Sequence, residues 1–301
     1  MSQLAAIFAP GFFDNAPVQI ALTVGAVVAI VSGAVGVFTV LRGQSFAGEA
    51  LGDIGTAGGS GAFLLTVGPL WGFAVVAVAA AAVMELIGIQ RPRGRDLATG
   101  IVLGAGLGLA ALFLYLNTVY HNTTGATFEI VFGSPFTITS STIPLVAAFS
   151  AVALSLILAL FRPLLLSSIN PEGAAARGIP VRLVGAGYLL ALAIAVALAA
   201  FTIGTILSTA LLVGPAATAL RLTRSPGKAV VAAGLIGVGV MWLGILMAYD
   251  SYYWPVGHGW PVSFFVVTLI FLGYLLARLP RLRGRHANGT PSDTAGEPAL
   301  G

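Results

Sequence analysis

Residues 18–41 read VQIALTVGAVVAIVSGAVGVFTVL, an apolar run without a single charged side chain. A helix needs about 20 such residues to cross the hydrocarbon layer of a bilayer. Eight further predominantly apolar runs follow along the chain, at 46–66, 69–89, 97–117, 140–161, 183–201, 204–220, 228–248 and 261–279. The sequence therefore predicts an all-α integral membrane protein with about nine transmembrane helices, in a range of eight to ten.

The composition independently favours an integral membrane protein. Of the 301 residues, 58% are hydrophobic and only 8% are charged, whereas soluble domains carry about a quarter charged residues. These proportions exclude an ordinary soluble enzyme and a disordered protein. Because the chain contains no cysteine, disulfides and thiolate metal sites are excluded as well.

The Lys and Arg residues predict the orientation of the chain in the membrane. With nine spans, all 14 of them fall in alternate junctions and the C-terminal end, and none falls in the other junctions. Basic loops face the cytoplasm, so we expect a multi-pass plasma-membrane protein with its N-terminus outside and its C-terminus in the cytoplasm. The net charge of +4 then reflects topology, and no nucleic-acid partner is expected.

The same pattern divides the chain into three parts. Residues 1–17 are expected to form an external N-terminal segment, and residues 18–280 a transmembrane domain. After Pro280 the sequence becomes rich in Gly, Pro, Ser, Thr and Arg, a composition typical of disorder. Residues 281–301 are therefore expected to be a disordered cytoplasmic tail.

Two carboxylates in the second apolar run are out of place in lipid. Glu49 and Asp53 are four residues apart, so a helix would project both from one face, about 6 Å apart along its axis. Like charges so placed repel, and each is costly in hydrocarbon unless it meets a water-filled cavity or a cation. A hard divalent cation suits such a pair. The alternative is that the span starts later and leaves both in cytoplasmic water.

Two segments carry residues that can interrupt a helix. Gly58-Gly59-Ser60-Gly61 could break the second span beside a cavity, or could simply let neighbouring helices pack closely. In the stretch 202–219, Pro215 removes one backbone donor in mid-span. Because both segments occur together, we expect a pore there, lined by four residues of the second segment: Thr205, Ser208, Thr209 and Pro215. The alternative is that the hydroxyls of Thr205, Ser208 and Thr209 only bond back to their own helix.

A short cytoplasmic helix is predicted between the fifth and sixth spans. Asn170 suits an N-cap, Pro171 the first helical position, and Glu172 the positive end of the helix dipole. Arg177 suits the last turn and Gly178 stops the helix. A helix of two turns is marginal in water, so the segment from Asn170 through Gly173 to Gly178 is expected to be held by a partner protein.

In this order the segments resemble the membrane permease subunit of the ABC transporters that take up zinc, manganese or iron. The resemblance covers roughly residues 18–280. It rests on five pieces: Gly48–Asp53, Arg95-Asp96 with Gly100, Phe132-Gly133-Ser134, Ser168–Gly178, and Gly204–Ala219 with its ending Gly-Pro-Ala-Ala-Thr-Ala.

The resemblance implies a type II importer: a homo- or heterodimeric permease with a short coupling helix at 170–178. A cytoplasmic ATP-binding subunit would dock there, and an extracellular metal-binding protein would deliver the ion. The ion would be substrate, with no permanently bound cofactor. The sequence contains no Gly-x-x-x-x-Gly-Lys-Ser/Thr loop, so we expect no enzyme activity in this chain and ATP hydrolysis on a separate one.

Two departures from the family pattern bear on the metal. The family usually has Asp and then His in the second span, whereas this chain has Glu49 and Asp53, a carboxylate pair that favours harder ions such as manganese over zinc. The last external junction is longer and more aromatic than usual, and His258 is a weak candidate ligand there. A proton-coupled secondary transporter using the same carboxylates is the alternative function.

Overall fold

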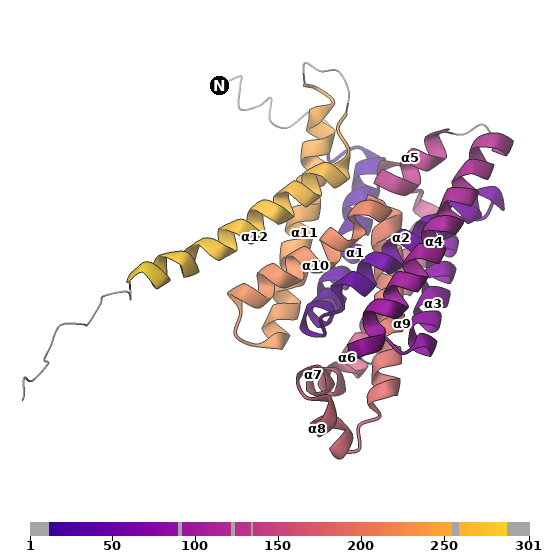
Figure 1. Ribbon diagram of the computed structural model, residues 1–301. Coiled ribbons are helices and arrows are strands. Elements are labelled where there is room, and N and C mark those ends of the chain that lie inside the picture. Colours follow the sequence, from indigo (N-terminus) through magenta and orange to yellow (C-terminus); the bar gives the residue numbers. More distant parts are fainter. Residues whose placement is uncertain (1–11, 90–91, 122–123, 134, 255–258, 288–301) are drawn as a thin grey trace, which may run out of the picture.

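The computed structural model describes residues 12–89, 92–121, 124–133, 135–254 and 259–287 (Figure 1). All regular structure within these ranges is helical. The α-helices are α1 (Ala16–Leu41), α2 (Ser45–Leu64), α3 (Pro69–Ile87), α4 (Pro92–His121), α5 (Thr124–Phe132), α6 (Ile143–Ala159), α7 (Phe161–Ile169), α8 (Pro171–Ala176), α9 (Val181–Ile203), α10 (Thr205–Leu222), α11 (Pro226–Ser251) and α12 (Val262–Ala287). Two 3-10 turns, η2 (Pro135–Thr137) and η3 (Ser140–Thr142), precede α6.

Each of the nine predicted spans coincides with one of these helices, which confirms the all-α membrane fold. Seven helical segments are long and apolar enough to cross a membrane by length and composition alone. The other two predicted spans are α2, which carries two carboxylates and many glycines, and α12, whose apolar part is the shorter segment Val262–Arg278.

Helices α1 and α9 form the centre of the bundle. Nearly every residue of α9 from Tyr188 to Ile203 is buried, and so is most of α1 from Val24 to Thr39. A helix that is apolar on all sides is surrounded either by protein or by lipid, and the burial of α1 and α9 shows that other helices surround them. Here α1 contacts α10, α11 and α6, while α9 contacts α3, α6 and α10.

Two polar contacts between helices lie at opposite ends of the bundle. At one end, Asn117 Nδ2 of α4 donates to the Ser60 carbonyl of α2, at 2.8 Å. At the other, Arg42 Nη1 donates to Ser167 Oγ of α7, at 3.2 Å. Helices α7 and α8 lie at this second end, and α5 lies at the opposite one (Figure 1).

Neither segment interrupts its helix, so of the two possibilities considered for Gly58–Gly61 the helix break is wrong. Helix α2 runs unbroken through Gly58–Gly61, and α10 continues through Pro215. The glycines serve close packing instead, because a Cβ at Gly58 would collide with the carbonyl oxygen of Gly72 on α3. The packing alternative is therefore confirmed for this segment.

At the C-terminus, α12 extends to Ala287, seven residues into the segment expected to be a disordered tail. The remainder of that expected tail, 288–301, lies outside the described residues, as do residues 1–11 of the expected N-terminal segment. Of that N-terminal segment, Phe12 is buried, and its ring meets Tyr249 of α11 edge-on, with centroids 5.2 Å apart.

Replacing Gly58 by alanine should lower the melting temperature of the purified protein. The added methyl would push α2 and α3 apart, and overpacking of this kind costs about 1–3 kcal/mol. Gly239→Ala on α11 is the matched control, since nothing lies within 4 Å of its Cβ position. Equal melting temperatures for the two variants would contradict the close α2–α3 contact.

Candidate functional site

Glu49 and Asp53 lie on one face of α2, in its second and third turns. Helix α2 begins at Ser45, so both carboxylates belong to the helix. In the single chain Glu49 is exposed and Asp53 is half-buried. No Lys or Arg occurs between Arg42 and Arg91 to neutralise them along the chain. The arrangement is a pair of like charges on an accessible helix face.

A neighbouring face of α2, about 100° around the helix from the carboxylates, packs against the rest of the bundle through two glycines. A Cβ at Gly48 would stand 2.9 Å from Leu212 Cδ2, and one at Gly52 would stand 2.7 Å from Ser208 Oγ. Both neighbours belong to α10. A larger side chain at either position would require these α10 side chains to shift, so the glycines permit the close approach of α2 to α10.

Two of the four predicted pore residues pack directly against α2. Thr205 is buried, and its Oγ1 accepts a hydrogen bond of 2.9 Å from Oγ1 of Thr56. Ser208 is also buried, and its hydroxyl donates to the Thr205 carbonyl, at 2.9 Å. Thr56 lies three residues after Asp53, one turn further along the helix. Sequence reasoning missed Thr56, although its spacing from Asp53 was a usable signal.

The other predicted residues are placed differently. Thr209 is half-buried on α10. Pro215 is buried in the part of α10 that faces α1, where a Cβ at Gly36 would contact Ala216 Cβ at 3.2 Å. His258 lies outside the described residues. The structure thus brings Thr205 and Ser208 near the carboxylate helix, but it does not bring Pro215 there.

Oxygen ligands near the carboxylates are few in a single chain. Across the described ranges no group of three or more His, Asp or Glu side chains is close enough to hold a metal ion. A hard cation such as Ca²⁺ or Mg²⁺ takes six or more oxygens. The pair alone can therefore give only a weak, partly hydrated site.

The predicted short helix is present as α8, with its capping as expected. The side chain of Asn170 accepts a hydrogen bond from the Gly173 backbone N–H, at 2.8 Å. Pro171 occupies the first helical position, and Gly178 adopts a left-handed φ of +78° at the end. Such side-chain caps stabilise a helix by about 1 kcal/mol.

One side of α8 packs on the bundle, and the other is open. Ala174 is fully buried, whereas Glu172 and Arg177 are exposed. Ile169, just before the helix, is 73% exposed despite its apolar side chain.

At the other end of the bundle, two segments meet backbone to backbone. Gly133 ends α5 with φ +70°, and Gly204 separates α9 from α10 with φ +88°. A Cβ at Gly204 would collide with the Val131 carbonyl oxygen. Only glycine fits such a contact, since it combines positive φ with the absence of a side chain.

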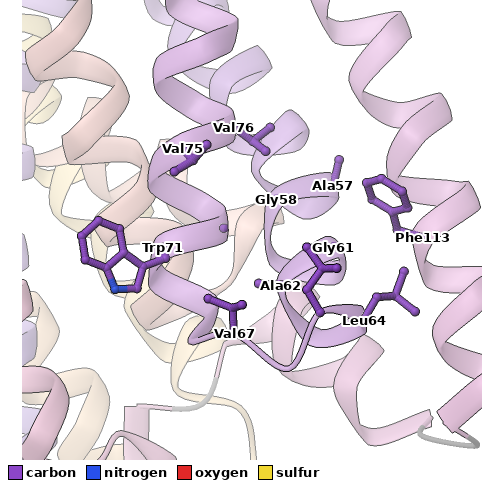
Figure 2. Close-up of a pocket in the computed structure, with 12 residues that line it drawn as sticks. Ala57, Gly58, Gly61, Ala62, Leu64, Val67, Trp71, Val75, Val76 and Phe113 are labelled. Atoms are coloured by element: carbon purple, nitrogen blue, oxygen red, sulfur yellow. The ribbon is translucent and has the colours of Figure 1, made fainter.

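An apolar pocket of about 430 Å³ opens between α2, α3 and α4, at the end of α2 away from the carboxylates (Figure 2). Trp71, Val76 and Phe113 surround it, and Gly58 and Gly61 lie along it on α2. No charged side chain lines this pocket. It therefore suits lipid tails and not an ion.

These features define a class: a multi-pass helical transport protein with an acidic face on one helix and an exposed short helix at one end. The chain belongs to the ABC 3 transport family, whose pattern it matches over residues 15–278.

Several of its relatives are named as manganese transport proteins. It is 27% identical to the manganese transport system membrane protein MntC of Listeria monocytogenes over 271 residues, covering 90% of this chain and 94% of that protein. It is 29% identical to the manganese import system permease protein ScaB of Streptococcus gordonii, covering 81% and 86%. A solved structure described as PsaBC from Streptococcus pneumoniae in complex with Fab superposes with a TM-score of 0.77, at 26% identity, over 93% of this chain and 100% of that one.

Replacing Gly204 by alanine should destabilise the protein and loosen the contact between α5 and α10. A left-handed non-glycine residue costs about 1–3 kcal/mol, and the methyl would also collide with α5. We expect a lower melting temperature than for Gly125→Ala, an exposed α5 position with open space around it. A Gly204→Ala protein as stable as this control would show that the backbone contact does not exist.

Proposed function

We propose that this chain is the membrane-spanning subunit of an ATP-driven importer of divalent metal ions, with manganese as the first candidate. The observation that carries the proposal is the carboxylate pair of α2, displayed on an accessible face in a member of the ABC 3 transport family. The names of its relatives support the same substrate.

The proposed path runs along the carboxylate face of α2. A divalent cation between Glu49 and Asp53 relieves the repulsion of the two carboxylates, so the ion is held more favourably at this point than along the rest of the path. The buried hydroxyls of Thr56 and Thr205 lie one turn further along α2. Binding has to remain weak for the ion to leave again, as expected for two carboxylates without a third acidic or imidazole ligand.

The ligand chemistry favours manganese over zinc and iron. Carboxylate oxygens suit hard ions, whereas zinc prefers imidazole and thiolate. The α2 face offers two carboxylates and no histidine, and all three histidines of the chain lie at or beyond position 121.

Three protein partners belong to the proposal. A cytoplasmic ATP-binding subunit would dock on α8, whose exposed side carries Glu172 and Arg177. A second permease subunit, identical or homologous, would face the accessible side of α2. An extracellular metal-binding protein would deliver the ion at the end of the bundle where α5 lies.

Asp53→Asn should lower manganese uptake strongly while leaving the fold intact. The substitution removes a charge with little change in volume, so it tests electrostatics and not packing. Loss of one charged ligand from a weak site should reduce uptake by at least about tenfold, equivalent to roughly 1.4 kcal/mol. The measurement is manganese uptake into vesicles that contain the permease, the ATP-binding subunit and the metal-binding protein.

Glu85→Gln on α3 is the matched control, because it removes a carboxylate from a different helix. The double variant Glu49→Gln/Asp53→Asn should be inactive, and manganese uptake at the parental rate would refute the proposed path. Asp53→His should retain some transport and shift its preference toward zinc. Uptake driven by a proton gradient without ATP would instead identify a secondary transporter.

The proposed orientation places the α5 end outside the cell and the α8 end in the cytoplasm. The absence of native cysteine permits a direct test at two exposed positions, Ser140 in η3 and Ser225 before α11. In intact cells a membrane-impermeant maleimide should label Ser140→Cys and spare Ser225→Cys. The reverse labelling would invert the topology.

A further inference from the structure

Arg42 occupies the short connection between α1 and the carboxylate helix α2. Its backbone N–H caps α1 by donating to the Phe38 carbonyl, at 2.9 Å. Gly43, with φ +63°, then turns the chain so that α2 can begin at Ser45. The backbone of Arg42 is therefore fixed by both helices.

The side chain of Arg42 points back into the bundle, onto two further helices. Its Nη1 donates to Ser167 Oγ on α7, at 3.2 Å. Its guanidinium carbon lies 5.1 Å from the ring centroid of Tyr188 on α9. A basic residue that only marks the cytoplasmic side would extend toward water, whereas Arg42 is half-buried against a completely buried ring.

On one side this network leads to α8. Ser167 lies three residues before Asn170, and the side chain of Asn170 caps α8. Ser167 is itself buried, and its hydroxyl donates to the Leu164 carbonyl within α7, at 3.1 Å. A displacement of α8 therefore moves the acceptor of the Arg42 hydrogen bond.

On the other side the network leads to the carboxylates. The hydroxyl of Tyr188 donates to Thr39 Oγ1 on α1, at 2.9 Å. The Thr39 methyl lies 3.9 Å from the Cβ position of Gly48, which is the residue before Glu49 on α2. Arg42 is thus connected to α2 in two ways: directly through the backbone that follows it, and through Tyr188 and Thr39, which pack at Gly48.

We propose that Arg42 is a positioning residue that carries the movement of α7 and α8 to the carboxylate-bearing turns of α2. The planar guanidinium suits this role, since it stacks on an aromatic ring and donates a hydrogen bond in a fixed geometry. The inference rests on the proposed function, in which an ATP-binding subunit docks on α8 and the ion passes Glu49 and Asp53.

The test uses spin labels on cysteines introduced into the cysteine-free chain, in the complex with its ATP-binding subunit. One pair joins Phe46→Cys on α2 to Val231→Cys on α11, and the other joins Arg162→Cys on α7 to the same α11 position. All three side chains are exposed. In the parental complex, adding ATP should change both label distances.

In Arg42→Gln, ATP should still change the α7–α11 distance but should leave the α2–α11 distance unchanged. Manganese transported per ATP hydrolysed should fall about tenfold, a size common for substitutions that interrupt coupling. Arg42→Lys, which keeps the charge and a donor but cannot stack, should be intermediate. Arg224→Gln, at an exposed position, is the control and should behave like the parental protein.

An α2–α11 distance that still responds to ATP in Arg42→Gln would overturn the inference, as would a parental α2 that does not respond. Loss of both distance changes in Arg42→Gln would indicate failed assembly and a merely structural role, which also contradicts it. Failure of the proposed function is distinguishable, because the parental labels would then respond to ATP while the vesicles took up no manganese.

Discussion

The hydrocarbon layer offers no hydrogen-bond partner to a peptide group, and the rest of this structure depends on that constraint. Every backbone N–H and C=O at membrane depth has to be satisfied within its own helix. Interruptions are therefore confined to the ends of the bundle, as at Gly43 and Gly204. Between the ends, association depends on close packing and not on the hydrophobic effect, which explains why glycines stand at the contacts of α2 with α3 and α10.

Helix α2 shows how this packing permits a polar helix inside the bundle. Its glycines let α3 and α10 approach closely, so van der Waals contacts stabilise the packing of α2 on these helices. The other polar groups of α2 differ in burial. The buried Thr56 hydroxyl donates a hydrogen bond to Thr205, while Glu49 and Asp53 lie on the accessible face. A charged side chain that is costly in lipid can persist there only if water, an ion or another subunit covers that face.

The sequence alone was sufficient to predict those features whose signals lie close together along the chain. Apolar length predicted the spans, and the succession of Asn170, Pro171 and Gly178 predicted α8 and its cap, because these signals lie within a few residues of each other. At Gly58–Gly61 local reasoning left a helix break and close packing both open, because a helix breaker is tolerated once neighbouring helices pack on it. The same holds at Pro215, through which α10 continues. The contacts of Arg42 with Ser167, and of Thr56 with Thr205, join residues 125 and 149 positions apart, so no local pattern could reveal them.

The two ends of α2 face opposite demands in the proposed transporter. In that transporter the N-terminal end of α2 has to move with α8. This end is joined to the bundle by hydrogen bonds and an aromatic stack around Arg42, and both interactions have a preferred geometry. At its C-terminal end it is held by glycine packing on α3 and by Asn117 bonding to Ser60, contacts that tolerate little displacement. Gly48 and Gly52 lie between these two ends, and their close neighbours on α10 are the side chains of Leu212 and Ser208. In the proposed transporter, a movement of the N-terminal turns would therefore shift these α10 side chains together with the carboxylates next to the two glycines.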